Sequence, residues 1–493
     1  MPARVRRLTN IEYERSVDAL VGAPEAVADR LPPDVRQDGY TPNHEQTVPS
    51  SWGSAVDAVA RDVAHRTVTR RLAELAPCAE RSAPNCAADF VDTIGRRAWR
   101  RPLEAVERAS LLAAFEEGRR EGGFAAGAEV VLTALLESPS FLYVTELGPG
   151  GPGGSVVRLT PYEVASLLSY TLRGAPPDEP LMKAAASGAL SIADGREAEA
   201  RRLLALSDTR KQFRRFVLEW LEVDGLARTA KSDELFPAYE DVKERMVAET
   251  SAFADEVMVF AGGSVGALLD ARFASVDPDM ARFYGLKTWG ARASLAKTRR
   301  AGVLQQASFL AAHAHEDGTS PVKRGDFVLR KLLCTRIPRP SEVGIETSFP
   351  PPAPAKTTRE RFSVHSENPA CRSCHENLDA LGYTFESFDA VGAAQTADHG
   401  KSVDTRARVT IGDQTVTFGD SLELTEFLAR DPDVSDCYSR QAFRYFTGQS
   451  DPKIEAELRS IARALPDGVA GNLFEQLIAY VRSDLFVERE VRP

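Results

Sequence analysis

Helix start and stop signals recur along most of the chain and constrain its fold more than any other feature. Residues 160–174 read TPYEVASLLSYTLRG, with Thr160 before Pro161, a glutamate three residues after the threonine, and Gly174 at the end. These are the boundary signals of an α-helix. Comparable helical patterns occupy residues 9–22, 54–75, 87–98, 105–121, 125–137, 197–206, 211–221, 239–260, 278–284, 300–312, 421–428, 434–445, 452–464 and 473–481. The sequence therefore predicts a mainly α, multi-domain protein.

Three segments interrupt the helical pattern. The run GPGGPGGS at residues 148–155 has almost no side chains to pack, which indicates a boundary. Residues 336–354 contain six prolines, which remove backbone donors, so we expect an extended strap. Residues 407–420, ARVTIGDQTVTFGD, alternate around Gly-Asp and predict a small β-hairpin. The predicted domains are a helical domain at 1–147, a middle helical domain at 156–335, the strap at 336–355, and a C-terminal domain at 356–493 that carries the hairpin.

Net charge and hydropathy narrow the classes of partner. A formal charge of -10 over 493 residues argues against nucleic-acid binding, which needs surplus lysine and arginine on the binding face. No apolar run approaches the roughly 20 residues of a membrane-spanning helix, so no transmembrane segment is predicted. The basic cluster GRRAWRRPL, residues 95–103, is interpreted as a helix end paired with acids, in preference to an anion site.

Residues 368–379, NPACRSCHENLD, contain the most specific chemical motif in the chain. Cys371, Cys374 and His375 have the spacing C-x-x-C-H, which is the attachment signature of c-type haem. On a short helix both thiols reach the haem vinyl groups, and the adjacent imidazole faces the iron as proximal ligand. The motif therefore predicts one covalent haem c.

Two other chemistries remain open for this motif. A structural zinc site needs four ligands, and without a second C-x-x-C pair the missing ones would come from Cys334, His365 or Cys437. A redox or structural dithiol is the other alternative, but SENPACRSC resembles a polar turn before a helix and not a strand.

The remaining four cysteines suggest disulfides if haem occupies the C-x-x-C pair. Cys78 and Cys86 are close in sequence, so they are the first expected bond in an oxidising compartment. A Cys334–Cys437 bond then follows by elimination. Four free thiols in a reducing cytosol are the alternative.

The N-terminal residues MPARVRRLTNIEYERSVDAL have a basic start but no apolar core of a signal peptide. We expect a periplasmic or extracellular protein whose signal has been removed and whose Met1 was added, with a lipid anchor on the precursor as one variant. A cytosolic location is the alternative.

The sixth iron ligand is not the downstream methionine of small electron-transfer cytochromes, because Met280 is the last methionine of the chain. An open iron would permit small-molecule or peroxide chemistry, whereas two histidine ligands favour electron transfer. The candidate distal histidines are His365, His313 and His315, then the more distant His44, His65 and His399.

Several acidic residues follow the motif. Glu386 and Asp389 could act as an acid/base pair, but helix capping and salt bridges are the favoured interpretation. Asp398, His399 and Asp404 match no standard calcium loop, so solvation of a surface loop is the alternative to a calcium site.

The ordered sequence blocks resemble a family of large bacterial exported proteins built from five consecutive domains of unknown function. The blocks that carry the resemblance are RRLTNIEYERSVDALVG, CAADFVDTIGRRAWRRPL, LLESPSFLYVTE, LTPYEVASLLSYTLRGAPPDEPL, RAGVLQQASFLAAHAHEDGTSPVKRGDFVLRKLLC, NPACRSCHENLDALGYTFESFDAVG and CYSRQAFRYFTGQ. The resemblance implies a mostly helical exported protein with one cytochrome-c-like region, in which Cys371, Cys374 and His375 attach the haem.

The resemblance extends to flanking residues. The block HEDGTSP is similar to a recurrent family block and implies that His315, Thr319, Ser320 and Arg324 line a site. The chain departs from the family after the motif, where Ala380 replaces a proline and relaxes the local turn.

The sequence as a whole predicts an exported c-type haem protein, an oxidoreductase that transfers electrons or oxidises an unidentified substrate. A large helical body around one haem suggests a redox partner or a bulky substrate. The alternative is a helical binding or scaffold protein without haem, in which the C-x-x-C pair forms a disulfide or part of a metal site.

Overall fold

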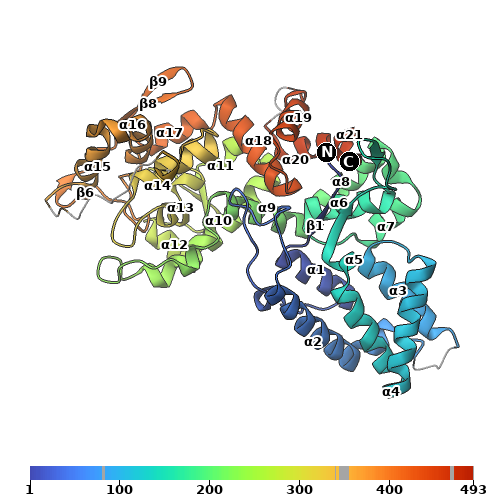
Figure 1. Cartoon of the computed structure of the whole chain (residues 1–493). Coiled ribbons are helices and arrows are strands. Elements are labelled where there is room, and N and C mark those ends of the chain that lie inside the picture. The colour runs from blue at the N-terminus through green and yellow to red at the C-terminus, as the bar shows by residue number, and fades with distance from the viewer. Residues whose placement is uncertain (80–83, 339, 344–352, 354, 467–470, 492–493) are drawn as a thin grey trace. The chain divides into compact units, whose positions relative to one another are not determined.

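A computed structural model describes residues 1–79, 84–338, 340–343, 353, 355–466 and 471–491. It is mainly α, with short two-stranded sheets, as the sequence predicts (Figure 1). The chain forms two compact units. Unit 1 comprises residues 1–212, 443–458 and 477–493, and unit 2 comprises residues 213–442 and 459–476. Within the described residues, no helix combines the length and the apolar composition needed to cross a membrane.

The helices of unit 1 are α1 (Asn10–Val21), α2 (Ser50–Leu75), α3 (Cys86–Trp99), α4 (Ala105–Glu137), α5 (Pro139–Leu142), α6 (Pro161–Arg173), α7 (Glu179–Ala186), α8 (Ala193–Leu204) and α21 (Asp484–Val487). Its strands are β1 (Arg4–Arg7), β2 (Tyr143–Glu146), β3 (Val156–Arg158) and β10 (Glu488–Glu490). The helices α9 (Ser207–Trp220), α18 (Pro432–Thr447), α19 (Pro452–Arg463) and α20 (Leu473–Arg482) contribute residues to both units.

The helices of unit 2 are α10 (Tyr239–Ala261), α11 (Val265–Asp270), α12 (Pro278–Phe283), α13 (Ala307–Ala312), α14 (Pro321–Phe327), α15 (Thr358–Glu367), α16 (Pro369–Tyr383) and α17 (Ser421–Leu428). Its strands are β4 (Phe273–Val276), β5 (Gly290–Ser294), β6 (Ala397–Asp398), β7 (Lys401–Ser402), β8 (Ala407–Ile411) and β9 (Gln414–Phe418). β8 and β9 pair antiparallel, which confirms the predicted hairpin.

The predicted helix signals act as caps in unit 1. Thr9 accepts a hydrogen bond from the Glu12 backbone, Glu12 binds the Thr9 backbone in return, and α1 ends at Gly22 with φ 76°. Thr160 and Glu163 cap α6 in the same way. Residues 105–121 and 125–137, expected as two helices, form the single element α4, which is broken by non-helical dihedrals at 122–123.

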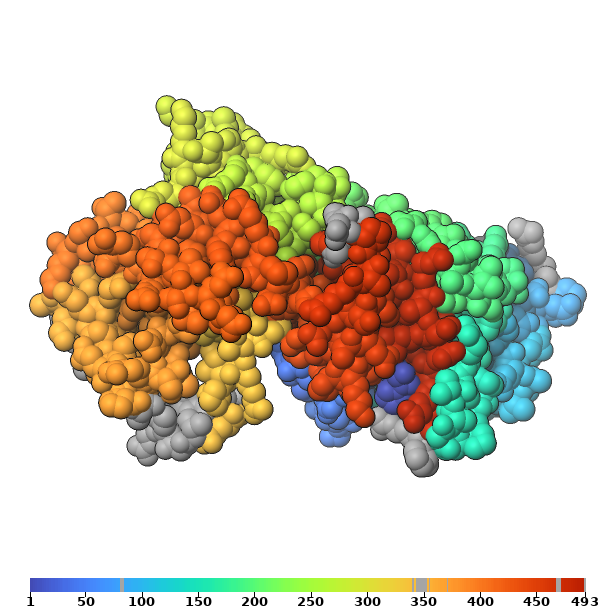
Figure 2. Space-filling view, turned by 90° about the horizontal axis from the view of Figure 1, so that it is seen from above, coloured from blue at the N-terminus to red at the C-terminus, as the bar shows by residue number. Residues whose placement is uncertain are grey.

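The two ends of the chain meet within unit 1. β10 pairs with β3, and Ala3 donates its backbone N–H to Glu490 O at 2.8 Å. Figure 1 marks the N and C ends close together, and in Figure 2 dark blue N-terminal residues adjoin red C-terminal ones. The buried Glu146 carboxylate binds Arg4 and Arg489 beside these strands. Burial alone would raise the pKa of Glu146, but the two guanidiniums outweigh it and hold the pKa at about 2.

The predicted linkers have different positions in the structure. The glycine-rich run at 148–155 connects β2 to β3 inside unit 1, so it joins two parts of one compact body. Residues 339, 344–352 and 354 of the proline-rich strap lie outside the described residues. The bounds of the four predicted domains stay a prediction, because the two compact units combine segments that are distant in the sequence.

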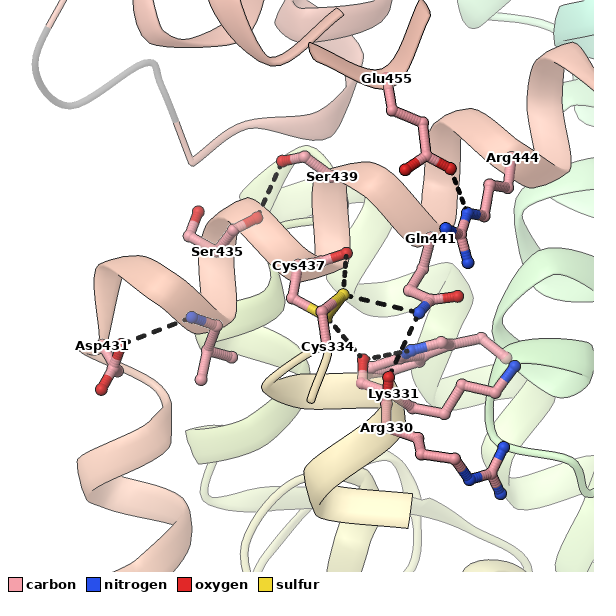
Figure 3. The surroundings of a disulfide bond; sticks show 12 residues. Arg330, Lys331, Cys334, Asp431, Ser435, Cys437, Ser439, Gln441, Arg444 and Glu455 are labelled. Atoms are coloured by element: carbon pink, nitrogen blue, oxygen red, sulfur yellow. Dashed lines mark hydrogen bonds and ion pairs between the residues drawn. A yellow bond between two sulfur atoms is a disulfide. The ribbon is translucent and has the colours of Figure 1, made fainter. Parts of the chain in front are cut away.

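Both predicted disulfides are present. Cys78 bonds to Cys86 in unit 1, and Cys334 bonds to Cys437 in unit 2. Figure 3 shows the second bond beside Gln441, whose amide donates to Arg330 O at 3.5 Å. It joins residues 103 positions apart, so it holds α18 against the segment that follows α14.

Candidate haem-attachment site

The C-x-x-C-H motif lies at the start of α16, within unit 2. Cys371, Cys374 and His375 are spaced i, i+3 and i+4, so the helix places the three side chains on one face. Both thiols are half-buried and unpaired, whereas the chain's other four cysteines form disulfides. The arrangement leaves two thiols and one imidazole available together.

Close backbone packing fixes the position of α16. A Cβ atom on Gly382 would lie 1.9 Å from Pro321 O, and one on Gly325 would lie 1.8 Å from Leu378 O. Both glycines therefore allow α14 and α16 to approach more closely than any other residue type would. On the other side, α15 packs against α16 and begins with a capping box formed by Thr357 and Glu360.

Asp379 organises the polar centre of the motif. Its side chain is 1% exposed, and Oδ1 lies 2.9 Å from Nδ1 of His375. Oδ2 lies 3.3 Å from Nδ1 of His365, which comes from α15. One carboxylate thus holds two imidazoles. Each of the three residues offers one atom that could bind a metal ion, and these atoms all lie within 4.8 Å of one another.

This arrangement determines which ring nitrogens are available. Because Nδ1 of His375 faces a carboxylate, Nδ1 is the nitrogen that donates to Asp379, and Nε2 is the nitrogen outside this hydrogen bond. The ring centroids of His365 and His375 are 4.2 Å apart at an interplanar angle of 50°. His365 therefore stands beside His375 on the shared carboxylate.

The other candidate distal histidines do not join this cluster in the described structure, and His313 and His315 were the nearer candidates among them. His313 is buried, its Nε2 lies 2.9 Å from Leu221 O, and its ring packs on Phe309 with centroids 4.5 Å apart. It is a core histidine with a satisfied ring nitrogen. His315 lies in the loop before α14, where its backbone N–H donates to Gly318 O.

Burial keeps the ring of His315 neutral. Desolvation, together with the nearby Lys323 and Lys231 ammonium groups, lowers the pKa of His315 to about 4. Lys231 in turn donates to His315 O at 2.7 Å. Cations therefore surround this loop.

A second polar cluster lies at the other end of α16. Thr319 Oγ1 donates to Glu386 Oε2 at 2.7 Å, and the guanidinium of buried Arg324 lies 3.5 Å from Oε1. Burial raises the pKa of Glu386 to about 7, although Arg324 and the Thr319 hydroxyl act in the opposite direction. The family resemblance implies that Thr319 and Arg324 line a site. The structure places both next to Glu386, which the sequence offered as a possible acid.

The other residues singled out from the sequence in this region, Ser320 and Asp389, make hydrogen bonds that stabilise local backbone structure. Ser320 caps α14 by accepting from the Lys323 backbone. Asp389 accepts backbone hydrogen bonds from Val391 and Ala393, and so stabilises a loop. These contacts agree with the capping interpretation of Asp389 and not with an acid/base pair.

The proposed calcium residues do not gather. Asp398 accepts from the backbone of Thr358, His399 lies 3.7 Å from Asp398, and Asp404 contacts Arg406. Within the described ranges, His365, His375 and Asp379 form the one group with metal-ligand geometry.

Sequence analysis missed Asp379, although a signal for it was present. Asp379 follows His375 by four residues on the same helix, which places a carboxylate and an imidazole on adjacent turns. The approach of His365 from α15 had no comparable signal, because it depends on the angle between two helices.

Comparison with family models gives four matches, each described as a protein of unknown function. They are PSD3 (DUF1587) at residues 6–69, PSD5 (DUF1595) at 86–146, PSD4 (DUF1592) at 159–286 and PSCyt3 (DUF1588) at 300–398. They follow one another along the chain in the order expected from the sequence blocks. The chain belongs to this multidomain family of unknown function.

The family matches place the site residues within one domain. Cys371, Cys374, His375 and Asp379 all fall inside the DUF1588 match, as does His365. Searches among curated proteins and among solved structures gave no match. The chemistry of the site is therefore argued from its own residues.

Proposed function

We propose that this family member is an exported c-type haem protein in which Cys371 and Cys374 hold one haem covalently and His375 binds its iron. The unpaired state of these two thiols in a chain whose other cysteines are all oxidised carries the proposal. Each thiol would add its S–H bond across one haem vinyl group, a step that needs no external oxidant.

The donor set fits this cofactor. The iron ligand of a haem protein is a neutral imidazole whose other nitrogen is fixed by a hydrogen bond. Asp379 supplies that bond to Nδ1 of His375, which leaves Nε2 as the nitrogen that would bind iron. When bound, haem would supply a one-electron redox centre, and the chain's own residues would orient the imidazole and shield one side.

The position of His365 bears on the sixth ligand. A histidine that binds iron from the opposite face must have the macrocycle between its ring and that of His375. The present separation of 4.2 Å and the shared carboxylate leave no room for it. His365 would have to leave Asp379 to act as a second ligand, so the geometry favours His375 as the one iron ligand that this cluster would supply.

The two disulfides support the expected location. Structural disulfides persist in oxidising compartments, and the same compartments are where haem is attached to C-x-x-C-H. An exported redox protein that exchanges electrons with a partner, or oxidises a substrate at the iron, accounts for both features.

A second candidate function rests on the same cluster. His365, His375 and Asp379 offer two imidazoles and one carboxylate, a donor set typical of a non-haem metal ion. This function requires His365 as a ligand and does not require the cysteines. The two proposals therefore make opposite predictions for substitutions at these positions.

The experiment expresses the full chain with an export signal in cells that contain haem-maturation machinery. Haem retention after denaturing electrophoresis is the readout. The variant Cys371→Ser/Cys374→Ser should lose all covalent haem, and the matched variant Cys78→Ser/Cys86→Ser should keep it. Absence of covalent haem from the exported wild-type protein would exclude the haem function.

Metal analysis of the same samples tests the second function. A bound transition metal that survives Cys371→Ser/Cys374→Ser and is lost in His365→Ala would establish the non-haem site. Retention of haem in His365→Ala, with no other metal present, would exclude it.

A further inference from the structure

Unit 1 contains a cavity far in sequence from the cysteine motif. Its volume is about 360 Å³, and α1, α3, α5 and α7, together with the residues just before α7, contribute to its lining. All of these elements belong to unit 1, in the blue to green part of the chain in Figure 1. Cavities of this volume accommodate small molecules.

Three arginines line this cavity. Arg96, Arg97 and Arg100 come from the end of α3, and all belong to the basic cluster that the sequence had assigned to a helix end. The structure shows that this cluster is only partly neutralised. Among the described residues, neither Arg97 nor Arg100 has a carboxylate within ion-pair distance.

The two unpaired guanidiniums differ in how they are held. Arg100 is 5% exposed and donates to the backbone oxygens of Ser140, Phe141 and Tyr143. Arg97 donates one N–H to Ala19 O, a carbonyl in the last turn of α1. Four N–H groups of Arg97 stay available for another acceptor.

Of the two carboxylates that line the cavity among the described residues, Glu179 alone competes for these cations. Asp178 is occupied, because it caps α7 and accepts two hydrogen bonds from Arg202 at 2.8 Å. Glu179 pairs with Arg96 at 3.1 Å, but both side chains are exposed, at 52% and 39%. Such a pair contributes little free energy and is readily replaced.

The rest of the lining is apolar. Leu20, Phe141 and Met182 face the same cavity as the arginines, and each is buried. A ligand with one anionic group and an apolar body would match both the arginines and the apolar part of the lining. The planar fork of arginine suits the paired oxygens of a carboxylate or a phosphate.

We propose that this cavity binds a small organic anion, with its acidic group on Arg96 and Arg97 and its apolar body against Leu20, Phe141 and Met182. Arg97 is exposed, although partial desolvation and the neighbouring charge of Arg96 lower its pKa, and an anion between the two would relieve this repulsion. The site lies outside the proposed haem region, so the presence of haem does not decide whether it binds.

Calorimetric titration of the purified full chain tests the proposal. Benzoate and phenyl phosphate carry the two acidic groups on one apolar ring, benzyl alcohol lacks the charge, and inorganic phosphate lacks the ring. We expect saturable binding of one equivalent of benzoate or phenyl phosphate, at least tenfold tighter than either control. The tighter of the two identifies the acidic group.

Two substitutions should act in opposite directions. Arg97→Gln should weaken binding about tenfold because it removes a charge-assisted pair. Glu179→Gln should strengthen binding about threefold because it removes the competing carboxylate. The control Arg119→Gln removes an arginine from the exposed face of α4 and should change neither value.

The outcomes that overturn the proposal are equally specific. It fails if no organic anion binds at up to about 10 mM, if benzyl alcohol or inorganic phosphate binds as tightly, or if Arg97→Gln and Arg119→Gln have the same effect. If Arg97→Gln does not fold, Arg96→Gln replaces it, since the ion pair of Arg96 is with the exposed Glu179.

Discussion

Two pairs of cysteines in unit 2 differ in their bonding state. Cys334 and Cys437 are 103 residues apart and form a disulfide, with Cys437 buried. Cys371 and Cys374 are three residues apart on α16, half-buried and reduced. The disulfide closes a long loop, where a cross-link stabilises most, whereas a bond between the second pair would close almost none. The comparison supports a stabilising role for the first pair, and haem attachment is the role that we propose for the second.

Removal of the two pairs should separate these roles most clearly. Replacing Cys334 and Cys437 with alanine should lower the free energy of unfolding by about 4.7 kcal/mol, because the closed loop is long. Replacing Cys371 and Cys374 with serine in the haem-free protein should change it by less than about 0.5 kcal/mol. Urea unfolding monitored by circular dichroism measures both, and comparable losses would contradict the division of roles.

The second prediction concerns pH and the polar cluster beyond α16. The pKa of Glu386 is about 7, above its ordinary value near 4.5, because burial outweighs Arg324, Thr319 and Arg359, while Asp398 adds to the rise. Between these values the folded state binds the extra proton, so its stability must fall as pH rises from 4.5 to 7.

The expected size of this decline is about 3 kcal/mol. Glu386→Gln cannot titrate, so its stability relative to wild type should improve by that amount across the same interval. Unfolding curves at several pH values measure the difference. A difference that stays constant with pH would show that Glu386 has an ordinary pKa.

The third prediction tests whether Asp379 holds the two histidines beside Cys371 and Cys374. Asp379→Asn removes the charge that both His375 and His365 bind, and should cost about 2 kcal/mol because the carboxylate is buried. Glu376→Gln on the exposed face of the same helix is the matched control and should be near neutral. Equal effects in a urea titration would mean that Asp379 holds neither ring.

The smallest expected effect concerns α15, which carries His365. Thr357→Ala removes the side chain that caps this helix and should destabilise it by about 1 kcal/mol. Hydrogen exchange of the α15 amides should accelerate accordingly, with the α6 amides as an internal reference. Unchanged exchange would show that packing against α16 alone holds α15.

Local features of this molecule could be read from the sequence. Thr9 and Gly22 bound α1 because a cap and a left-handed glycine depend only on neighbouring residues. The Cys334–Cys437 bond could be inferred because the other cysteines had nearer uses. The C-x-x-C-H motif at Cys371 could also be recognised, because it is defined only by the spacing of neighbouring residues.

Other features depend on contacts between helices. The sequence offered His365 as one candidate distal ligand, but it could not show that the rings of His365 and His375 share Asp379 because α15 packs beside α16. Likewise, nothing in the sequence places Arg97 against Ala19 or directs it into a cavity. Such positions follow from tertiary packing, which short-range patterns do not specify.

The intact mass of the exported full chain, measured under denaturing and non-reducing conditions, tests the central claim most directly. The account predicts the polypeptide mass, less about four mass units for two disulfides, plus the mass of one haem. A mass lower by about six units without haem would show a third disulfide between Cys371 and Cys374. That result would contradict the assignment of Cys371 and Cys374 to haem attachment.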